Sequence, residues 1–300
     1  MRRPVTVPVV RAAKRRNGAD PVVMVTAYDT PGARAADAAG VDVILVGDSL
    51  ANNVLGYEDT LQLTVDDMVH HTAAVARAKP GALVVADMPW LSYHLSIEDA
   101  VRNAAALVRA GAQAVKLEGG RPRVPVVEAI IRAEIPVVGH LGLTPQSVLA
   151  MGGYRVQARD TDSAQALRDA ALALVGAGCF CLVLEGVPDV VAAAVTEAVD
   201  VPTIGIGAGG SCDGQVLVYH DLLGLGTGTP PKFVRRYADL ATATATAIAA
   251  YAADVRSGSF PSDAESYHAP ADVAEALEQP IGSPAGTAGR APARRSPSPR

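Results

Sequence analysis

The sequence predicts a single α/β domain, a (β/α)₈ TIM barrel with an N-terminal extension and a disordered C-terminal tail. Short apolar runs alternate with Ala-rich helical segments through most of the chain. The connections between these segments are mostly short, and no break in composition divides them into two domains. The length of 300 residues also suits a barrel, which typically takes about 250 residues.

Eight strands are expected in order along the chain. They cover residues 21–26, 42–47, 82–86, 113–117, 135–139, 179–184 and 201–204, with the eighth somewhere in 216–225. The helices are expected at residues 31–39, 65–79, 96–110, 124–133, 163–176, 189–198 and 232–252. The run from Val43 to Val46 is apolar without interruption, as is typical of a parallel strand covered on both faces.

Local signals fix several helix ends. Thr64 can cap the helix that follows it, and Asp66 and Asp67 complement the dipole of its first turn. Ser96 begins a sequence similar to a capping box, and Gly111 ends the helix that this box opens. These signals support the alternation of strands and helices independently of the hydrophobic pattern.

The expected domain boundaries follow from composition. Residues 1–265 form the barrel domain, and residues 266–300 form a tail rich in Pro, Ser, Ala and Arg. From about residue 281 this tail has almost no apolar side chains to bury, so we expect disorder there. Near the other end, Arg11, Lys14, Arg15 and Arg16 are expected to form a solvated helix face.

Composition excludes several classes of function. A formal charge of -5 predicts no general attraction to nucleic acid, and 4% aromatic residues argue against a stacking platform for bases or sugars. No signal peptide and no apolar segment long enough for a membrane span are found, so we expect a cytoplasmic protein without membrane contact. Cys179 and Cys181 have no second pair at zinc spacing, which predicts buried, reduced thiols.

Ionisable side chains stand at the ends of five successive predicted strands. They are Asp48 with the adjacent Ser49, Asp87, Lys116 with Glu118, His140, and Glu185. Active sites of (β/α)₈ barrels lie at the C-terminal ends of the strands, so these residues should meet in one site. The period of two along a strand also places Lys116 and Glu118 on one side, opposite Val115 and Leu117.

The residue types indicate the chemistry. Asp48, Asp87 and Glu118 are hard oxygen donors, which favour Mg²⁺ retaining several waters and leave positions for a 2-oxo acid. Lys116 can place positive charge beside an oxyanion that develops on this substrate. Glu185 follows a very apolar strand, and a carboxylate in such surroundings suits a general base that forms an enolate.

Eight short motifs resemble those of the ketopantoate hydroxymethyltransferase family over residues 4–265. The motifs are VTAYD at 25–29, LVGDSL at 45–50, ADMP at 86–89, VKLEG at 115–119, GHLGLTPQ at 139–146, VLEG at 183–186, GIGAG at 205–209 and CDGQV at 212–216. The resemblance implies a (β/α)₈ barrel that transfers a one-carbon unit from 5,10-methylenetetrahydrofolate to 3-methyl-2-oxobutanoate. It also implies a homo-decamer of two pentameric rings.

The resemblance also assigns roles to individual residues. Asp48 and Asp87 match metal-binding aspartates, and Glu118 matches an acid that approaches the metal directly or through water. Ser49 and Lys116 match residues that hold the carboxylate and carbonyl of the 2-oxo acid. Glu185 matches the proton-abstracting base, and His140 is expected to orient the substrate or a carboxylate. The chain departs from the family at Asn52, Asn53 and Tyr57, which affects the loop after Asp48.

Other interpretations were weighed against this one. A C–C lyase or phosphomutase of the phosphoenolpyruvate mutase and isocitrate lyase type would use similar enolate chemistry, but the reactive-cysteine motif usual in such lyases is missing from the sequence. A barrel kept as a scaffold would be expected to lose some of the acids at the strand ends. The GIGAGG sequence at residues 205–210 fits the dinucleotide-binding pattern, yet no amphipathic helix follows it, so a tight barrel loop is favoured.

Overall fold

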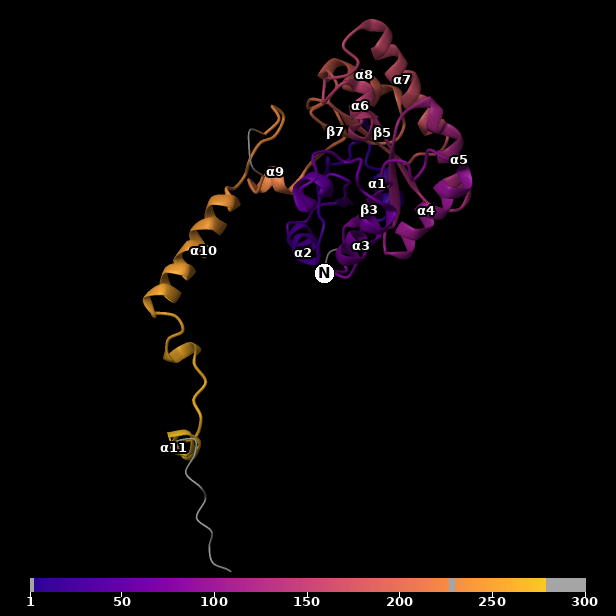
Figure 1. Ribbon diagram of the computed structural model, residues 1–300. Helices are drawn as coiled ribbons and strands as arrows, with labels where there is room; N and C mark the ends of the chain where they lie inside the picture. The colour runs from indigo at the N-terminus through magenta and orange to yellow at the C-terminus, as the bar shows by residue number, and fades with distance from the viewer. Residues whose placement is uncertain (1–2, 227–229, 279–300) are drawn as a thin grey trace, which may run out of the picture. The chain divides into compact units, whose positions relative to one another are not determined.

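Eight parallel strands form a closed barrel in the computed structural model, which describes residues 3–226 and 230–278 (Figure 1). Each strand pairs with the next in chain order, and β8 pairs with β1. The strands are β1 (Val22–Thr26), β2 (Val43–Val46), β3 (Leu83–Asp87), β4 (Ala114–Glu118), β5 (Val137–Gly142), β6 (Cys181–Glu185), β7 (Thr203–Ile206) and β8 (Gly214–Leu217). The predicted fold class is confirmed.

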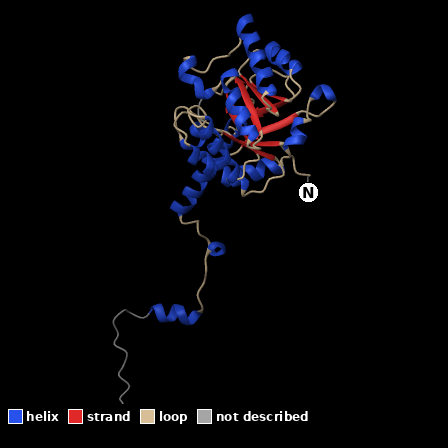
Figure 2. Ribbon diagram, turned by 90° about the vertical axis from the view of Figure 1, so that its right-hand side faces the viewer, coloured by secondary structure: helices blue, strands red, loops and turns tan. Residues whose placement is uncertain are grey.

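Helices surround this barrel, as Figure 2 shows with the strands in red at the centre. Those that follow β1 to β6 are α2 (Thr30–Ala38), α3 (Val65–Ala76), α4 (Ile97–Arg109), α5 (Val124–Arg132), α6 (Val148–Met151) with α7 (Thr161–Gly176), and α8 (Asp189–Ala198). The short α9 (Tyr219–Leu223) follows β8, whereas β7 and β8 are joined by a loop without a helix. This loop carries the GIGAGG sequence and agrees with the favoured interpretation of it.

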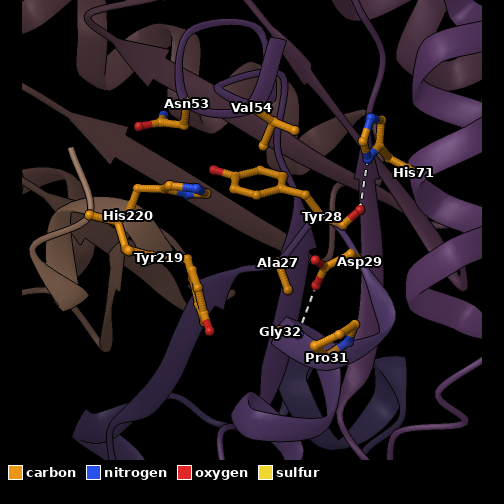
Figure 3. Close-up of a pocket in the computed structure, with 11 residues that line it drawn as sticks. Ala27, Tyr28, Asp29, Pro31, Gly32, Asn53, Val54, His71, Tyr219 and His220 are labelled. Atoms are coloured by element: carbon orange, nitrogen blue, oxygen red, sulfur yellow. Dashed lines mark hydrogen bonds between the residues drawn. The ribbon is translucent and has the colours of Figure 1, made fainter. Parts of the chain in front are cut away.

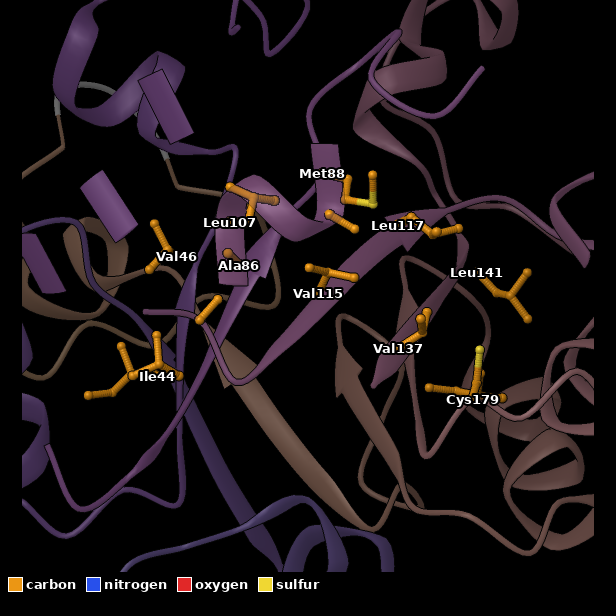
Figure 4. Packing of buried hydrophobic residues seen from close by; sticks show 14 of the residues in the cluster. Ile44, Val46, Ala86, Met88, Leu107, Val115, Leu117, Val137, Leu141 and Cys179 are labelled. Carbon is orange, nitrogen blue, oxygen red and sulfur yellow. The ribbon is translucent and has the colours of Figure 1, made fainter. Parts of the chain in front are cut away.

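The alternation of side chains along the strands builds two hydrophobic cores. One lies between the barrel and its helices and includes Ile44, Val115 and Leu117 (Figure 4). The other fills the inside of the barrel with residues such as Leu45 and Val85. Because Val115 and Leu117 point outward to the helices, Lys116 and Glu118 point inward, as predicted from the period of two.

The eighth strand begins two residues before the predicted window. Gly214 opens β8, although glycine in a strand usually indicates a bulge or a loop. A Cβ atom at Gly214 would lie 2.3 Å from the carbonyl oxygen of Val22, so this position requires the close approach that only glycine allows. The next predicted helix also starts late: α10 is Leu240–Ser257, and Asp239 accepts a hydrogen bond from the Thr242 amide at 3.3 Å in its first turn.

The prediction of a solvated basic cluster near the N-terminus holds for the exposed Arg11, Arg15 and Arg16 but is wrong for Lys14. Helix α1 (Val7–Arg11) ends early, and the following turn carries Lys14 to the N-terminal end of the barrel. Lys14 is 1% exposed. Its Nζ donates to Asp213 Oδ2 at 2.8 Å and to the carbonyl oxygen of Thr196 at 2.6 Å, so it ties the extension to β8.

We expect Lys14→Ala to destabilise the protein, because it leaves the buried Asp213 carboxylate without its counterion. Breaking a buried ion pair on one side typically costs roughly 3–5 kcal/mol. The midpoint of urea unfolding, followed by circular dichroism, should fall clearly below that of wild type. Arg11→Ala removes an exposed positive charge from the same segment and should leave the midpoint nearly unchanged. Equal midpoints for both variants would contradict the assigned role of Lys14.

The chain divides by its internal contacts into two compact units, residues 1–242 with the barrel and residues 243–300. The second unit includes most of α10 and, at its C-terminal side, α11 (Ala271–Glu278). The predicted domain boundary at residue 265 stays a prediction, and the disorder expected from about residue 281 lies outside the described residues. None of the described helices combines the length and apolar character needed to cross a membrane. The three cysteines are buried and unpaired, as expected.

Candidate active site

All seven residues predicted to form the site line one small cavity at the C-terminal end of the barrel. They are Asp48, Ser49, Asp87, Lys116, Glu118, His140 and Glu185. The polar side is closed by side chains that are almost fully buried, among them Asp87 at 2% exposure and Lys116 at 4%. Apolar side chains, including Val183 and Ile206, form another wall. The structure therefore gathers the predicted residues, while their chemical roles stay predictions.

Strand register brings the charged residues of neighbouring strands together. Asp87 at the end of β3 pairs in register with Lys116 of β4, and Glu118 pairs with His140 of β5. Lys116 Nζ lies 3.1 Å from Asp87 Oδ1. Burial acts to lower the pKa of Lys116, but the surrounding carboxylates, Asp87 first, outweigh this effect and raise its pKa. Lys116 therefore remains a fixed cation in the cavity.

Asp48 and Asp87 form a close pair of acids. The backbone amide of Asp48 donates to Asp87 Oδ2 at 3.0 Å. Burial and the neighbouring carboxylates of Asp87 and Glu118 raise the pKa of Asp48 to about 8. Burial also raises the pKa of Asp87, although Lys116 opposes the shift. Additional positive charge is therefore needed before both aspartates ionise easily at neutral pH.

His140 lies between two carboxylates. Its Nδ1 is 3.1 Å from Glu118 Oε1, and its Nε2 is 3.2 Å from Glu185 Oε2. Burial acts to lower the pKa of His140, but the carboxylates of Glu118 and Glu185 outweigh it and raise the pKa to about 9. Among the described residues, His140 Nε2 and Glu118 Oε1 have no hydrogen bond of good geometry, so these contacts are ion pairs. Lys116 Nζ also lies 3.2 Å from His140 Nδ1. The expectation that His140 orients a carboxylate stays a prediction.

Two residues of the site were not predicted from the sequence. Gln146 Nε2 donates to Asp48 Oδ2 at 2.8 Å, and the Gln146 amide donates to Glu118 Oε2 at 3.0 Å. Tyr93 OH donates to Gln146 Oε1 at 2.6 Å and accepts from the Glu118 amide at 3.1 Å. Gln146 ends the GHLGLTPQ motif, which was the only available signal, whereas Tyr93 stands in a loop without any pattern. Both hold the acids in place.

Ser49 is held by residues from the first two strands. Its Oγ lies 2.9 Å from the hydroxyl of Tyr28, which accepts from Thr26 Oγ1 at 2.8 Å. The turn after β2 leads into a single turn of π-helix, Ala51–Leu55, a feature frequent at functional sites. Asn53, one of the departures from the family pattern, donates from Nδ2 to the carbonyl oxygen of Ser49 at 2.8 Å. This departure thus supports the position of Ser49.

The charges of the cavity fit an added cation. Four carboxylates face only one lysine and one histidine, and Asp87 Oδ1 and Glu118 Oε1 are buried without a hydrogen bond of good geometry. Within residues 3–226 and 230–278, no three His, Cys, Asp or Glu side chains form a group that could hold a metal ion, so Asp48, Asp87 and Glu118 do not form a complete three-ligand site in the structure. Mg²⁺ commonly binds through only one or two carboxylates and completes its shell with water and substrate oxygens.

Comparison with known proteins gives a consistent result. Residues 4–263 match the family model described as ketopantoate hydroxymethyltransferase. The chain is 56% identical over 264 residues to the 3-methyl-2-oxobutanoate hydroxymethyltransferase of Moorella thermoacetica, covering 88% of this chain and 97% of the relative. It is 55% identical to the protein of the same name from a Methylobacterium species over 91% of this chain and 94% of the relative.

Solved structures show the same fold at much lower identity. The structure of a phosphonopyruvate hydrolase in complex with oxalate and Mg²⁺ superposes with a TM-score of 0.57 at 15% identity, covering 91% of this chain and 95% of the other. The structure of 2,3-dimethylmalate lyase, a member of the PEP mutase and isocitrate lyase superfamily, superposes with a TM-score of 0.56 at 20% identity over 85% of this chain and 89% of the other.

Proposed function

The chain belongs to the ketopantoate hydroxymethyltransferase family, and from this premise we propose how its own residues carry the reaction. The enzyme transfers a hydroxymethyl group from 5,10-methylenetetrahydrofolate to 3-methyl-2-oxobutanoate and gives 2-dehydropantoate, a step of pantothenate biosynthesis. The observation that supports the proposal is a single cavity that holds two paired aspartates, a fixed lysine and a carboxylate positioned by a histidine.

Asp48 and Asp87 are the residues that would hold Mg²⁺, with Glu118 close enough to contact it or one of its waters. A bound Mg²⁺ supplies polarisation of the keto oxygen and stabilises negative charge there. Gln146 keeps the Asp48 carboxylate oriented through its hydrogen bond of 2.8 Å. Lys116 Nζ lies beside the Asp87 carboxylate. It adds a second positive charge to the cavity, and this charge does not depend on the metal.

The 2-oxo acid would lie with its polar end toward these groups. Ser49 donates its hydroxyl proton to the substrate carboxylate, and Lys116 interacts with the keto oxygen. The isopropyl group then meets the apolar wall that includes Val183 and Ile206. This orientation leaves the C3 hydrogen toward the side of the cavity where Glu185 enters from the end of β6.

Glu185 is the base that removes the C3 proton. Its Oε2 is held 3.2 Å from His140 Nε2, so the carboxylate stays oriented before the proton moves. The electron pair of the C3–H bond forms the C2=C3 double bond of an enolate. C3 then forms a bond to the one-carbon unit, the two bonds from that carbon to N5 and N10 of the folate break, and one water supplies the hydroxyl group. The remaining proton of that water and the C3 proton taken up by Glu185 pass to the two folate nitrogens and complete tetrahydrofolate.

The proposal is tested by deuterium exchange at C3 of 3-methyl-2-oxobutanoate in D₂O with Mg²⁺, followed by NMR with and without tetrahydrofolate. We expect exchange, and also 2-dehydropantoate when methylenetetrahydrofolate is added. If the protein shows neither exchange nor product under these conditions, the proposal is wrong. Product with a phosphonate or a C–C cleavage substrate instead would favour the lyase and phosphomutase class.

We expect Mg²⁺ binding to strengthen as the pH rises toward 8. In the metal-free protein the pKa of Asp48 is about 8, so below this pH a proton competes with the cation for the carboxylate. The apparent affinity should therefore rise by up to about tenfold per unit between roughly pH 6 and pH 8 and then level off. Isothermal titration with MgCl₂ at constant ionic strength measures this. An affinity independent of pH over this range would contradict the protonation of Asp48.

We also propose that the protein is the homo-decamer that the family resemblance implies. The residues that line the cavity in the structure come from one chain. Light scattering coupled to size-exclusion chromatography measures the mass directly. A monomeric or dimeric mass would overturn this part of the proposal without affecting the reaction.

A further inference from the structure

A second cavity adjoins the active site at the same end of the barrel (Figure 3). Its volume is about 520 Å³, which lies within the usual range of small-molecule sites. It is enclosed by the segments that follow β1, β2 and β8, with Tyr28, Asn53, Val54, Tyr219 and His220 among its lining residues. The mechanism described above uses none of this space.

Hydrogen bonds join lining residues of the two cavities. Tyr28 lines the second cavity, and its hydroxyl lies 2.9 Å from the Oγ of Ser49, which lines the active site. Tyr219 lines the second cavity as well, and its amide donates at 2.9 Å to the Oγ1 of Thr26, which lines the active site. The second cavity therefore adjoins the first across these hydrogen-bonded residues.

Tyr28, Tyr219 and His220 bring aromatic rings to the lining of this cavity. The ring centroids of Tyr28 and His220 are 5.5 Å apart, and those of Tyr219 and His220 are 5.8 Å apart. Among the described residues His220 Nδ1 has no hydrogen-bond partner although it is buried. Burial lowers the pKa of His220 despite the nearby Asp221 and Asp29, so the ring is neutral at pH 7 and can both donate and accept. These surfaces suit a planar heteroaromatic ring.

Asp29 adds a carboxylate to the lining of the cavity. Asp29 caps α2, because its Oδ1 accepts from the Gly32 amide at 2.7 Å. Capping occupies one carboxylate oxygen, so Oδ2 is the atom that would accept hydrogen bonds from a ligand. Figure 3 shows Asp29 below Tyr28, near Ala27 and on the same side of the cavity as Pro31. Aromatic rings at one side and a carboxylate at the other define a slot for a flat ring that carries N–H donors.

We propose that this cavity binds the pterin ring of the tetrahydrofolate co-substrate. The inference rests on the proposed function, because a transferase with two substrates needs the one-carbon donor next to the acceptor carbon. A pterin is a flat bicyclic heterocycle with adjacent N–H donors at one edge and ring nitrogens that accept hydrogen bonds. Asp29 matches the donor edge, His220 matches an acceptor, and Tyr28 and Tyr219 provide faces for contact.

The first test fills the cavity without touching the active site. Val54 lines the cavity and is 44% exposed, whereas its neighbour Leu55 is 40% exposed and does not line it. We expect Val54→Trp to raise KM for methylenetetrahydrofolate by tenfold or more and to leave folate-independent deuterium exchange at C3 within twofold of wild type. Leu55→Trp adds the same side chain one residue away and should change neither quantity.

A second variant tests the carboxylate and remains informative if Val54→Trp folds poorly. Asp29→Asn keeps an oxygen that can cap α2 and removes the charge. We expect it to raise KM for methylenetetrahydrofolate by roughly tenfold, as for the loss of a hydrogen bond to a charged group, with exchange unchanged. If wild type exchanges and transfers while both variants keep the wild-type KM, the pterin site is wrong and the function stands. If wild type shows neither activity, the function itself fails.

Discussion

Glu185→Gln should abolish deuterium exchange at C3 of 3-methyl-2-oxobutanoate and with it the formation of 2-dehydropantoate. The glutamine side chain has almost the same size but cannot accept the proton. Positioned general bases contribute about 10²–10⁴-fold to the rates of proton transfer, so a loss of this order is expected. Because Glu185 takes no part in the proposed metal binding, the affinity for Mg²⁺ should stay within about threefold of wild type.

Glu197→Gln is the control that separates the loss of the proposed base from the loss of a negative charge. Glu197 lies in the helix that follows Glu185, and its side chain is 81% exposed, so this variant makes the same change of charge outside the cavity. It should exchange and turn over at the wild-type rate. Unchanged exchange in Glu185→Gln would remove Glu185 from the role of base. Lost exchange together with lost Mg²⁺ binding would mean that the variant disturbs the whole cluster of acids.

His140 links this prediction to the geometry of the cavity. With its ring nitrogens 3.1 Å from Glu118 and 3.2 Å from Glu185, it lies between an acid of the proposed metal site and the proposed base. In Glu185→Gln the amide oxygen of glutamine can replace the carboxylate oxygen that lies 3.2 Å from His140 Nε2. The pair should therefore remain in place, and the loss of exchange reports the chemistry and not a collapse of the site.

Much of the barrel and of the site could be predicted from the sequence, because both follow from simple periodicity. An apolar run that ends in a charged residue marks a strand end, and in a parallel barrel all such ends meet at one face. The period of two alone placed Lys116 and Glu118 inside. Asp48, Asp87, His140 and Glu185 needed only the additional condition that neighbouring strands are in register, which the structure meets.

The residues that escaped prediction depend on contacts between distant segments. Gln146 reaches Asp48 across 98 positions of sequence, and Lys14 reaches Asp213 across 199. Nothing near Lys14 distinguishes it from the exposed arginines around it, since burial of its ammonium group depends on a partner that only folding brings close. The start of β8 at Gly214 was missed for a related reason. Glycine is needed there because the carbonyl oxygen of Val22, in another strand, lies too close for a side chain.

Asp87→Asn should cause the second large loss, because it removes a charge from the proposed metal position without changing the shape of the side chain. The asparagine oxygen can still accept from the Asp48 amide, as Asp87 Oδ2 does at 3.0 Å, so the strand ends should stay in place. We expect Mg²⁺ affinity to fall roughly 100-fold and turnover at saturating substrate and ordinary Mg²⁺ to fall by a similar or larger factor.

The same variant carries a second expectation that a merely structural role would not produce. Burial is the largest cause of the raised pKa of Asp48, and the charge of Asp87 is the second. Without that charge Asp48 should ionise at lower pH, so the residual binding of Mg²⁺ should level off at lower pH than in wild type. Asp189→Asn, at the exposed start of α8, makes the same change of charge and should alter neither affinity nor its pH dependence. If Asp87→Asn keeps the wild-type Mg²⁺ affinity, the cation does not bind at Asp87. If the affinity falls but its pH dependence does not shift, Asp87 takes part in metal binding without raising the pKa of Asp48.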